Sequence, residues 1–248
     1  MSHRPAALAT LLAAALAPLL GAPPAAAQVE VGVGADLVTR YVWRGYDFGD
    51  SFSAQPSLAL TAGGLEVGVW ASYAVSTADA NEVDLYVSYT AGPITVGVTD
   101  YYFPSAPPDP DVTSRADVFN VRSGGEGAHS LEPFVSYSGG EALPLTITAA
   151  TVAYNDPAFS TYVEAAYAFG VGRTTLEIAA GSVLALDPPD GTEGAPFYGT
   201  TRNAAVTNLA LSASHEVPIT AQFSLPVFGR YVVNPDTERA FVVFGVSL

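Results

Sequence analysis

The segment 240–248 alternates with a period of two, the period at which successive side chains of a β-strand point to opposite faces. One face of this segment is wholly apolar, and it consists of Ala240, Val242, Phe244, Val246 and Leu248. The other face becomes smaller and more polar toward its end. Termini of soluble domains usually fray into polar tails. An alternating strand that runs to the last residue therefore predicts a β-protein that presents one strand face to lipid.

The first 27 residues have the organisation of a secretory signal peptide. An early cation, Arg4, precedes an Ala- and Leu-rich stretch over 6–20, and small residues fill positions 25–27 before Gln28. This pattern predicts cleavage after residue 27 and a single domain over 28–248. The alternative, a retained anchor, requires about 20 unbroken apolar residues, and prolines and glycines over 18–24 interrupt the stretch.

Beyond residue 28, apolar stretches are interrupted every second or third residue by Gly, Ser, Thr or a charge. This predicts alternating strands and no transmembrane helix. The predicted strands are 30–44, 53–62, 65–75, 82–90, 94–103, 129–138, 145–154, 160–169, 173–184, 204–215, 219–232 and 239–248. An even number of strands brings both termini to the periplasmic side of an outer-membrane barrel. The fold expected is therefore all-β, a transmembrane antiparallel β-barrel of about 12 strands.

The connections between these strands alternate in length. Tight turns are expected at 63–64, 91–93, 170–172 and 216–218, whereas long connections rich in Pro, Asp, Gly and Ser cover 45–52, 104–128 and 185–203. Short periplasmic turns and long outer loops are typical of outer-membrane barrels. A soluble β-sandwich has no reason to sort its loops in this way.

Charged side chains fall on one face of several predicted strands, the face that a lumen requires. The pore-lining candidates are Asp36, Arg40, Arg44, Glu66, Glu82, Asp84, Glu177 and Arg239. Two roles are open for Arg40 and Arg44. They could line a pore and select ions, or they could pair with inward acids such as Glu66, Glu82 or Asp84 and plug a small barrel.

The longest connection, 104–128, is the third outer loop. Loops longer than about 15 residues are usually functional or disordered. An inward fold of this loop would constrict the lumen, and the candidates for that role are Asp109, Asp111, Arg115, Asp117 and Arg122. A mobile external loop is the other interpretation.

Composition excludes several classes of function. Nine basic residues against 24 acidic ones give a formal net charge of −15, which argues against nucleic-acid binding. No cysteine is present, so neither a lipidated start nor a disulfide framework is expected. No metal-ligand spacing, phosphate loop or nucleophile motif occurs. We therefore expect no enzyme, no cofactor and no metal.

Residues 37–58 contain the element Tyr41-x-Trp43-Arg44-Gly45, a variable loop, and Gln55-Pro56 at the start of the second strand. This segment resembles the opening hairpin of the TorF-type putative porins, also called the conserved hypothetical Gcw family. The resemblance implies an outer-membrane barrel, and the family carries no established substrate.

These features together predict a passive, porin-like channel for small solutes or ions in the bacterial outer membrane, with the lipid bilayer as its surroundings. The alternative is a non-conducting structural or adhesion barrel whose acidic loops make the contacts. A membrane-embedded hydrolase is a third hypothesis, and no catalytic triad supports it.

Overall fold

The computed structural model describes residues 28–76, 81–104, 117–123, 127–184, 197–198 and 204–248. Its strands are β1 (Glu30–Val38), β2 (Val42–Trp43), β3 (Tyr46–Asp47), β4 (Ser53–Ala62), β5 (Leu65–Ala74), β6 (Glu82–Ala91), β7 (Ile94–Tyr102), β8 (His129–Ser138), β9 (Leu145–Thr151), β10 (Thr161–Val171), β11 (Thr174–Leu184), β12 (Ala204–Pro218), β13 (Ser224–Asn234) and β14 (Arg239–Ser247). Within these ranges no helix is long and apolar enough to span a membrane.

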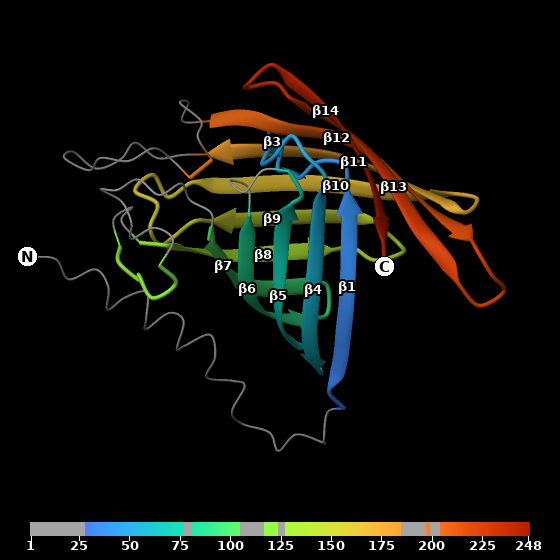
Figure 1. Ribbon diagram of the computed structural model, residues 1–248, viewed down its shortest axis with the longest axis horizontal. Helices are drawn as coiled ribbons and strands as arrows, with labels where there is room; N and C mark the ends of the chain where they lie inside the picture. The colour runs from blue at the N-terminus through green and yellow to red at the C-terminus, as the bar shows by residue number, and fades with distance from the viewer. Residues whose placement is uncertain (1–27, 77–80, 105–116, 124–126, 185–196, 199–203) are drawn as a thin grey trace, which may run out of the picture.

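Twelve of the strands close into one antiparallel barrel, which confirms the predicted fold and strand number (Figure 1). Each strand from β4 to β14 pairs with the next one along the chain, and β1 closes the ring between β4 and β14. The β1–β14 seam is short, with Asp36 opposite Ser247 and Val38 opposite Gly245. The apolar terminal segment predicted from its alternation is therefore the closing strand.

Tight turns join strand pairs at one end of the barrel, the end at which β1 begins and β14 finishes. The turns at 63–64 and 92–93 lie where they were expected, whereas the turn expected at 170–172 covers 172–173, because β10 continues to Val171. The turn expected at 216–218 is wrong, because β12 continues to Pro218 and the turn covers 219–223. The Thr220 hydroxyl accepts the backbone N–H of Gln222 and Phe223 there, and this bonding closes the turn beyond the proline.

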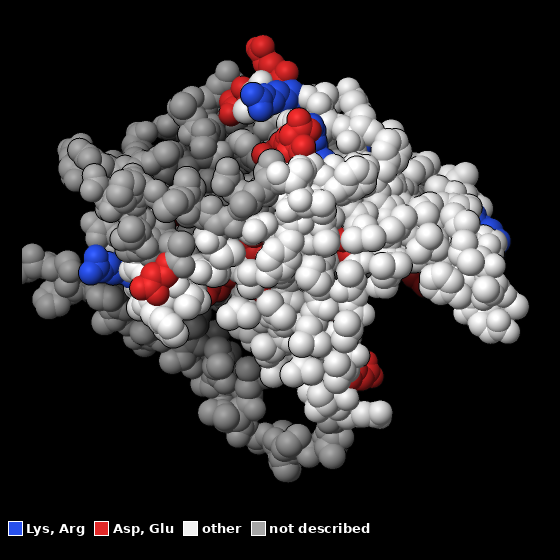
Figure 2. Space-filling view, in the orientation of Figure 1, with Lys and Arg blue, Asp and Glu red and all other residues white. Residues whose placement is uncertain are grey.

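The outer face of the barrel is apolar. Large aliphatic and aromatic side chains such as Val33, Leu85, Ile178 and Phe244 are exposed on it, and Figure 2 shows that the visible outer face of the strands is nearly free of charged residues. Charged residues such as Glu82 lie on the inner face, as the alternation predicts. The barrel therefore has the inverted polarity that suits a lipid surrounding.

The first strand is shorter than predicted, because β1 ends at Val38 and not at Arg44. Arg44 and Gly45 have φ values of 51° and 86°. Positive φ at both central residues is the requirement of a two-residue type I′ turn. The turn reverses the chain, so that β2 pairs with β3 and Trp43 lies opposite Tyr46. Residues 39–52, named the inner hairpin below, therefore leave the barrel wall.

Arginine at Val67 or at Leu85 is expected to cost about 2–4 kcal/mol of folding free energy in a bilayer, because both side chains lie on the outer apolar face. Arginine at Ser88, on the inner face of β6, is the matched control and should be tolerated. Urea unfolding in phospholipid vesicles measures both costs. Equal costs would contradict the face assignment. Ser72 is not a usable control, because it is fully buried beside Gln55.

Candidate functional site

The inner hairpin lies inside the barrel, near the end that carries the long connections. Its turn contacts the wall at β12 and β13. The side-chain amide of Asn234 donates a 3.0 Å hydrogen bond to the Gly45 carbonyl. A Cβ at Gly45 would stand 1.7 Å from the Thr207 carbonyl oxygen. Gly45 is therefore required twice, for its backbone conformation and for its close approach to the wall.

The flanks of the inner hairpin contact the other strands around the barrel. The Tyr41 ring lies 5.4 Å from the Trp70 ring on β5, and the Trp43 ring lies 5.4 Å from the Tyr101 ring on β7. Val42 packs in an apolar cluster with residues of β13 and β14, including Val232. One short hairpin thus contacts opposite sides of the barrel, so it fills the lumen at this level.

A buried ion pair fixes the tip of the inner hairpin to β8. Arg44 Nη1 lies 2.6 Å from Glu132 Oε1, and Arg44 Nη2 lies 3.0 Å from Glu132 Oε2. The hydroxyl groups of Tyr101 and Tyr198 donate to the same carboxylate at 2.8 and 2.6 Å. Arg44 also donates to the Tyr198 hydroxyl. Glu132 is 1% exposed and is compensated by a bidentate arginine and two phenols, an arrangement that we call the Arg44 latch.

Aromatic rings complete the surroundings of the guanidinium. Arg44 Cζ lies 4.2 Å from the Trp43 ring centroid and 4.5 Å from the Tyr162 ring centroid. Both distances allow cation–π attraction, which is stronger where water is excluded. Burial raises the pKa of Tyr198 above its ordinary value, and Glu132 adds to that effect. The Tyr198 hydroxyl therefore keeps its proton and remains a donor to the carboxylate.

The latch also explains why a non-glycine residue occupies a left-handed position. A positive φ at Arg44 costs on the order of 1–3 kcal/mol of backbone strain. Loss of either partner of a buried, hydrogen-bonded ion pair costs about 3–5 kcal/mol. Relaxation of the turn would withdraw Arg44 and leave Glu132 buried without its partner, which costs more free energy than the strain it relieves. The ion pair therefore holds the strained turn in place.

Arg40 contributes to the inner hairpin in a different way. Its guanidinium pairs with Asp47 at 3.6 Å and with Asp50, of which the Asp47 side chain is largely buried and the Asp50 side chain is exposed. The predicted inward row of Asp36, Arg40 and Arg44 on one strand is wrong, because the chain leaves the wall after Val38. The arginines pair with Asp47, Asp50 and Glu132 rather than with Glu66, Glu82 or Asp84.

The other pore-lining candidates divide between the lumen and the rim. The inward-facing ones are Asp36, Glu66, Glu82, Asp84 and Glu177. Glu66 accepts a hydrogen bond from Thr61 at 3.3 Å near the tight-turn end. Arg239 is exposed at the start of β14, so it lies at the rim.

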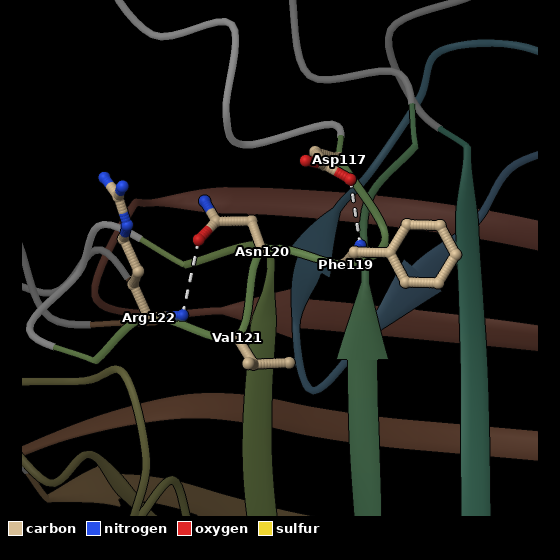
Figure 3. Close-up of a pocket in the computed structure, with 5 residues that line it drawn as sticks. All are labelled: Asp117, Phe119, Asn120, Val121 and Arg122. Carbon is tan, nitrogen blue, oxygen red and sulfur yellow. Dashed lines mark hydrogen bonds between the residues drawn. The ribbon is translucent and has the colours of Figure 1, made fainter.

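The described part of the third loop lies at the mouth of the barrel, over the beginning of β8 (Figure 3). Asp117 accepts the backbone N–H of Phe119 at 2.9 Å, and the Arg122 N–H donates to the Asn120 side chain at 3.3 Å. His129 on β8 lies 2.8 Å from the Val118 carbonyl. The predicted constriction residues Asp117 and Arg122 therefore border a small surface pocket.

Three further constriction candidates, Asp109, Asp111 and Arg115, lie outside the described residues. Within the described parts of the chain, the segment seen to fill the lumen is the inner hairpin and not loop 104–128.

Sequence reasoning missed Glu132, Tyr198, Glu164 and Arg230. Alternation within 129–138 places Glu132 inward, between the outward Leu131 and Pro133. Its position in the lumen could therefore have been predicted from the sequence. Tyr198 follows no strand pattern and gives no such signal. Glu164 and Arg230 line a cavity of about 240 Å³ on one side of the inner hairpin, and a second cavity of about 240 Å³ lies on the other side.

No group of three or more acidic or histidine side chains is arranged to hold a metal ion within the residues that the structure describes. Asp100 and His129 form a pair at 2.9 Å near the mouth. His129 and Ser130 are neighbours on β8 and so point to opposite faces.

These features define a closed antiparallel barrel with an apolar exterior and a lumen filled at one level by its own first connection. The chain belongs to the family described as a bacterial protein of unknown function (Gcw_chp), whose sequence profile matches residues 22–183. That range contains the inner hairpin and Glu132. The Gcw resemblance is confirmed, and the name TorF-type porin stays a prediction.

Similar solved structures are also barrels. A mutant of the Rh. blastica porin is 11% identical to this chain. The match covers 89% of this chain and 99% of the porin chain, with a TM-score of 0.37. The translocator domain of the autotransporter NalP from Neisseria meningitidis is 9% identical to this chain. That match covers 98% of this chain and 94% of the translocator chain, with a TM-score of 0.34. No curated protein matches the chain.

Loss of one latch partner should release the inner hairpin. Because the chain has no cysteine, a cysteine at Val42 is a unique probe of its burial. We expect maleimide to label this probe at least about tenfold faster in an Arg44→Met or Glu132→Gln background, since a buried charge is then left unpaired. A cysteine at Ser88 is the control and should label at an unchanged rate. Unchanged labelling at Val42 would show that the latch does not hold the inner hairpin.

Proposed function

We propose that this chain is an outer-membrane channel for small solutes or ions, narrowed by its inner hairpin. The closed barrel with its apolar exterior supports a place in a bilayer. In this proposal, residues 1–27 direct secretion and are removed, and residues 28–248 form the barrel. Its surroundings are lipid, and the molecules it handles are small solutes or ions.

The observation that carries the proposal is the way in which the inner hairpin is held. Only its end residues, Thr39 and Phe52, make backbone-to-backbone hydrogen bonds with the wall, and residues 40–51 take no part in the barrel's ladder, in which β1 pairs directly with β4. Side-chain contacts hold it, chiefly the Arg44 latch. Its displacement would therefore open the lumen without breaking a strand pair. A segment that only stabilised the wall would not need a separate latch across the lumen.

The lumen beyond the inner hairpin has the polarity that solute passage needs. Inward threonines and serines such as Thr61, Ser88 and Ser136 accompany the acids Glu66 and Glu177 toward the tight-turn end. Charged and hydroxyl-bearing walls solvate ions, and rings of charge set their selectivity. The excess of acids on this wall favours cations over anions.

Single-channel recording in planar bilayers tests the proposal. The protein is purified in detergent from bacteria that express the full gene. Replacement of residues 40–50 by a short Gly-Ser linker leaves β1 and β4 intact and should raise conductance, because the barrier in the lumen is removed. Gly45→Ala should act in the same direction, since its Cβ would collide with the Thr207 carbonyl.

Gly63→Ala is the matched control for that substitution. Gly63 also has a positive φ, of 62°, but nothing lies within 4 Å of its Cβ position. Alanine there introduces backbone strain without a collision, and conductance should not change. If neither the unmodified protein nor the linker variant passes current, the channel proposal fails. The non-conducting structural or adhesion barrel then takes its place.

Sidedness provides an independent test. Single cysteines at Gly63, in a tight turn, and at Thr237, in the exposed β13–β14 connection at the opposite end, should react with an impermeant maleimide from opposite sides of the outer membrane. Thr237→Cys should label in intact cells, and Gly63→Cys only after permeabilisation, because short turns face the periplasm. Labelling of both in intact cells would reject this orientation.

A further inference from the structure

Two carboxylates on β6 are buried under the inner hairpin, and neither has a cationic partner among the described residues. Glu82 is 3% exposed and Asp84 is 7% exposed. One oxygen of each, Glu82 Oε2 and Asp84 Oδ1, has no hydrogen-bond partner in that part of the chain. Arginines pair instead with Asp47, Asp50 and Glu132 in the described residues. A buried carboxylate in this position is stable only when a proton or a cation neutralises it.

Asp84 lines a cavity of about 240 Å³ between the inner hairpin and the wall. Five aromatic rings line the same cavity, and they belong to Tyr41, Trp43, Trp70, Tyr86 and Tyr101. Burial, followed by the negative charges of Glu82 and Asp84, raises the pKa of Tyr41, so its hydroxyl keeps its proton and is a donor in its hydrogen bond with Glu82. The cavity therefore combines aromatic walls with one buried acid, Asp84, whose Oδ1 has no hydrogen-bond partner among the described residues.

The ring of Tyr86 forms one wall of this cavity by lying over a glycine, an arrangement that recurs around the barrel at Gly97 with Phe134 and at Gly245 with Phe228. A Cβ at Gly68, opposite Tyr86 in the strand pairing, would stand 2.4 Å from the Tyr86 ring. Glycine at this position lets the ring lie flat against β5. Tyr41 and Tyr101 are buried, whereas Trp70, Tyr86 and Thr99 are half-buried. The cavity thus opens on the side toward the tight-turn end of the lumen.

We infer that this cavity binds a small organic cation, an alkylated or protonated amine, between the aromatic rings and the Asp84 carboxylate, with Glu82 nearby on the same face of β6. Aromatic faces attract an alkylammonium group through cation–π interaction, and tryptophan does so most strongly. The carboxylates supply the counter-charge in a region of low dielectric constant. Binding at this place does not depend on conduction, so it extends beyond the proposed channel.

Other occupants fit the site less well. A proton shared by Glu82 and Asp84 accounts for the carboxylates but leaves the five rings around a cavity unexplained. Ca²⁺ and Mg²⁺ require six or more oxygen ligands, and the walls here are mainly aromatic carbon. The volume of about 240 Å³ lies below that of ordinary drug-sized pockets, which limits the ligand to a small amine.

The chain itself provides the probe. It contains two tryptophans, Trp43 and Trp70, and both line the cavity. Intrinsic tryptophan fluorescence of the detergent-purified protein therefore reports on this cavity. Because Trp43 also lines the second cavity of the lumen, beside Arg44, the Asp84→Asn variant assigns the signal to this site. We expect a saturable change on titration with choline chloride at constant ionic strength. The same titration with 3,3-dimethylbutan-1-ol, the neutral isostere of choline, should give no saturation, and neither should sodium chloride.

Asp84→Asn should weaken choline binding at least tenfold, since it removes one charge without changing the size of the side chain. It should not impair folding, because it removes an unpartnered buried charge. Glu66→Gln is the control, a lumen carboxylate outside the cavity, and binding should be unchanged. Trp70→Leu, with Trp43 as the remaining reporter, should also weaken binding.

Three results would overturn the inference. They are an unsaturable response to choline, an equal response to the neutral alcohol, and unchanged affinity in Asp84→Asn. If Asp84→Asn stabilises the barrel against urea while no cation binds, a proton shared between the two carboxylates explains the site instead. None of these outcomes depends on current through a bilayer, so failure of this inference and failure of the channel proposal are separate results.

Discussion

The width of a twelve-stranded barrel is the constraint on which the rest of this structure depends. Barrel diameter grows with strand number, and at about eight strands the wall's own side chains fill the interior. With twelve strands they do not, so the space must hold water or another part of the chain. Here the connection between β1 and β4 turns inward and fills the lumen at one level. The lumen charges are arranged around that segment.

A few interactions, each with a large effect on free energy, determine the position of the inner hairpin. The type I′ turn needs two positive φ values, and one of them falls on Arg44. The same residue donates to Glu132, which is compensated by four hydrogen bonds. Buried ion pairs add little net stability compared with apolar packing, but they are costly to break on one side. Such a pair therefore favours one position of the hairpin over all others.

The barrel could be predicted from the sequence because the faces and ends of its strands depend on residues that are close together in the chain. Period-two alternation fixes which side chains face lipid, and turn residues such as Gly63-Gly64 fix where strands end. Strand number and faces were predicted correctly for that reason. Residues 39–44 continue the same alternation, so the pattern extended the first strand too far. The chain leaves the wall at a bend over 39–40. The positive φ values at Arg44 and Gly45 then reverse it, and contacts with β8, β12 and β13 hold the reversed segment in the lumen.

The candidate site was less predictable, because its contacts join residues far apart in the chain. Arg44 and Glu132 are separated by 88 positions and Arg44 and Tyr198 by 154. Alternation marks Arg44 and Glu132 as polar residues of the lumen but cannot say which acid meets which arginine. A plug held by arginine pairing was one of two open interpretations, and its partners came only from the three-dimensional packing.

The aromatic cavity and the Arg44 latch meet at neighbouring residues, and this has a thermodynamic consequence. Tyr41 and Trp43 line the cavity from the inner hairpin, whereas Trp70, Tyr86 and Tyr101 belong to the wall. A ligand in the cavity contacts both parts only while the hairpin is in place. A ligand that binds one of two conformations better shifts the population toward it. An organic cation in this cavity would therefore favour the latched position of the hairpin. The ratio of latched to released molecules would rise by at most the ratio of the cation's affinities for the two positions.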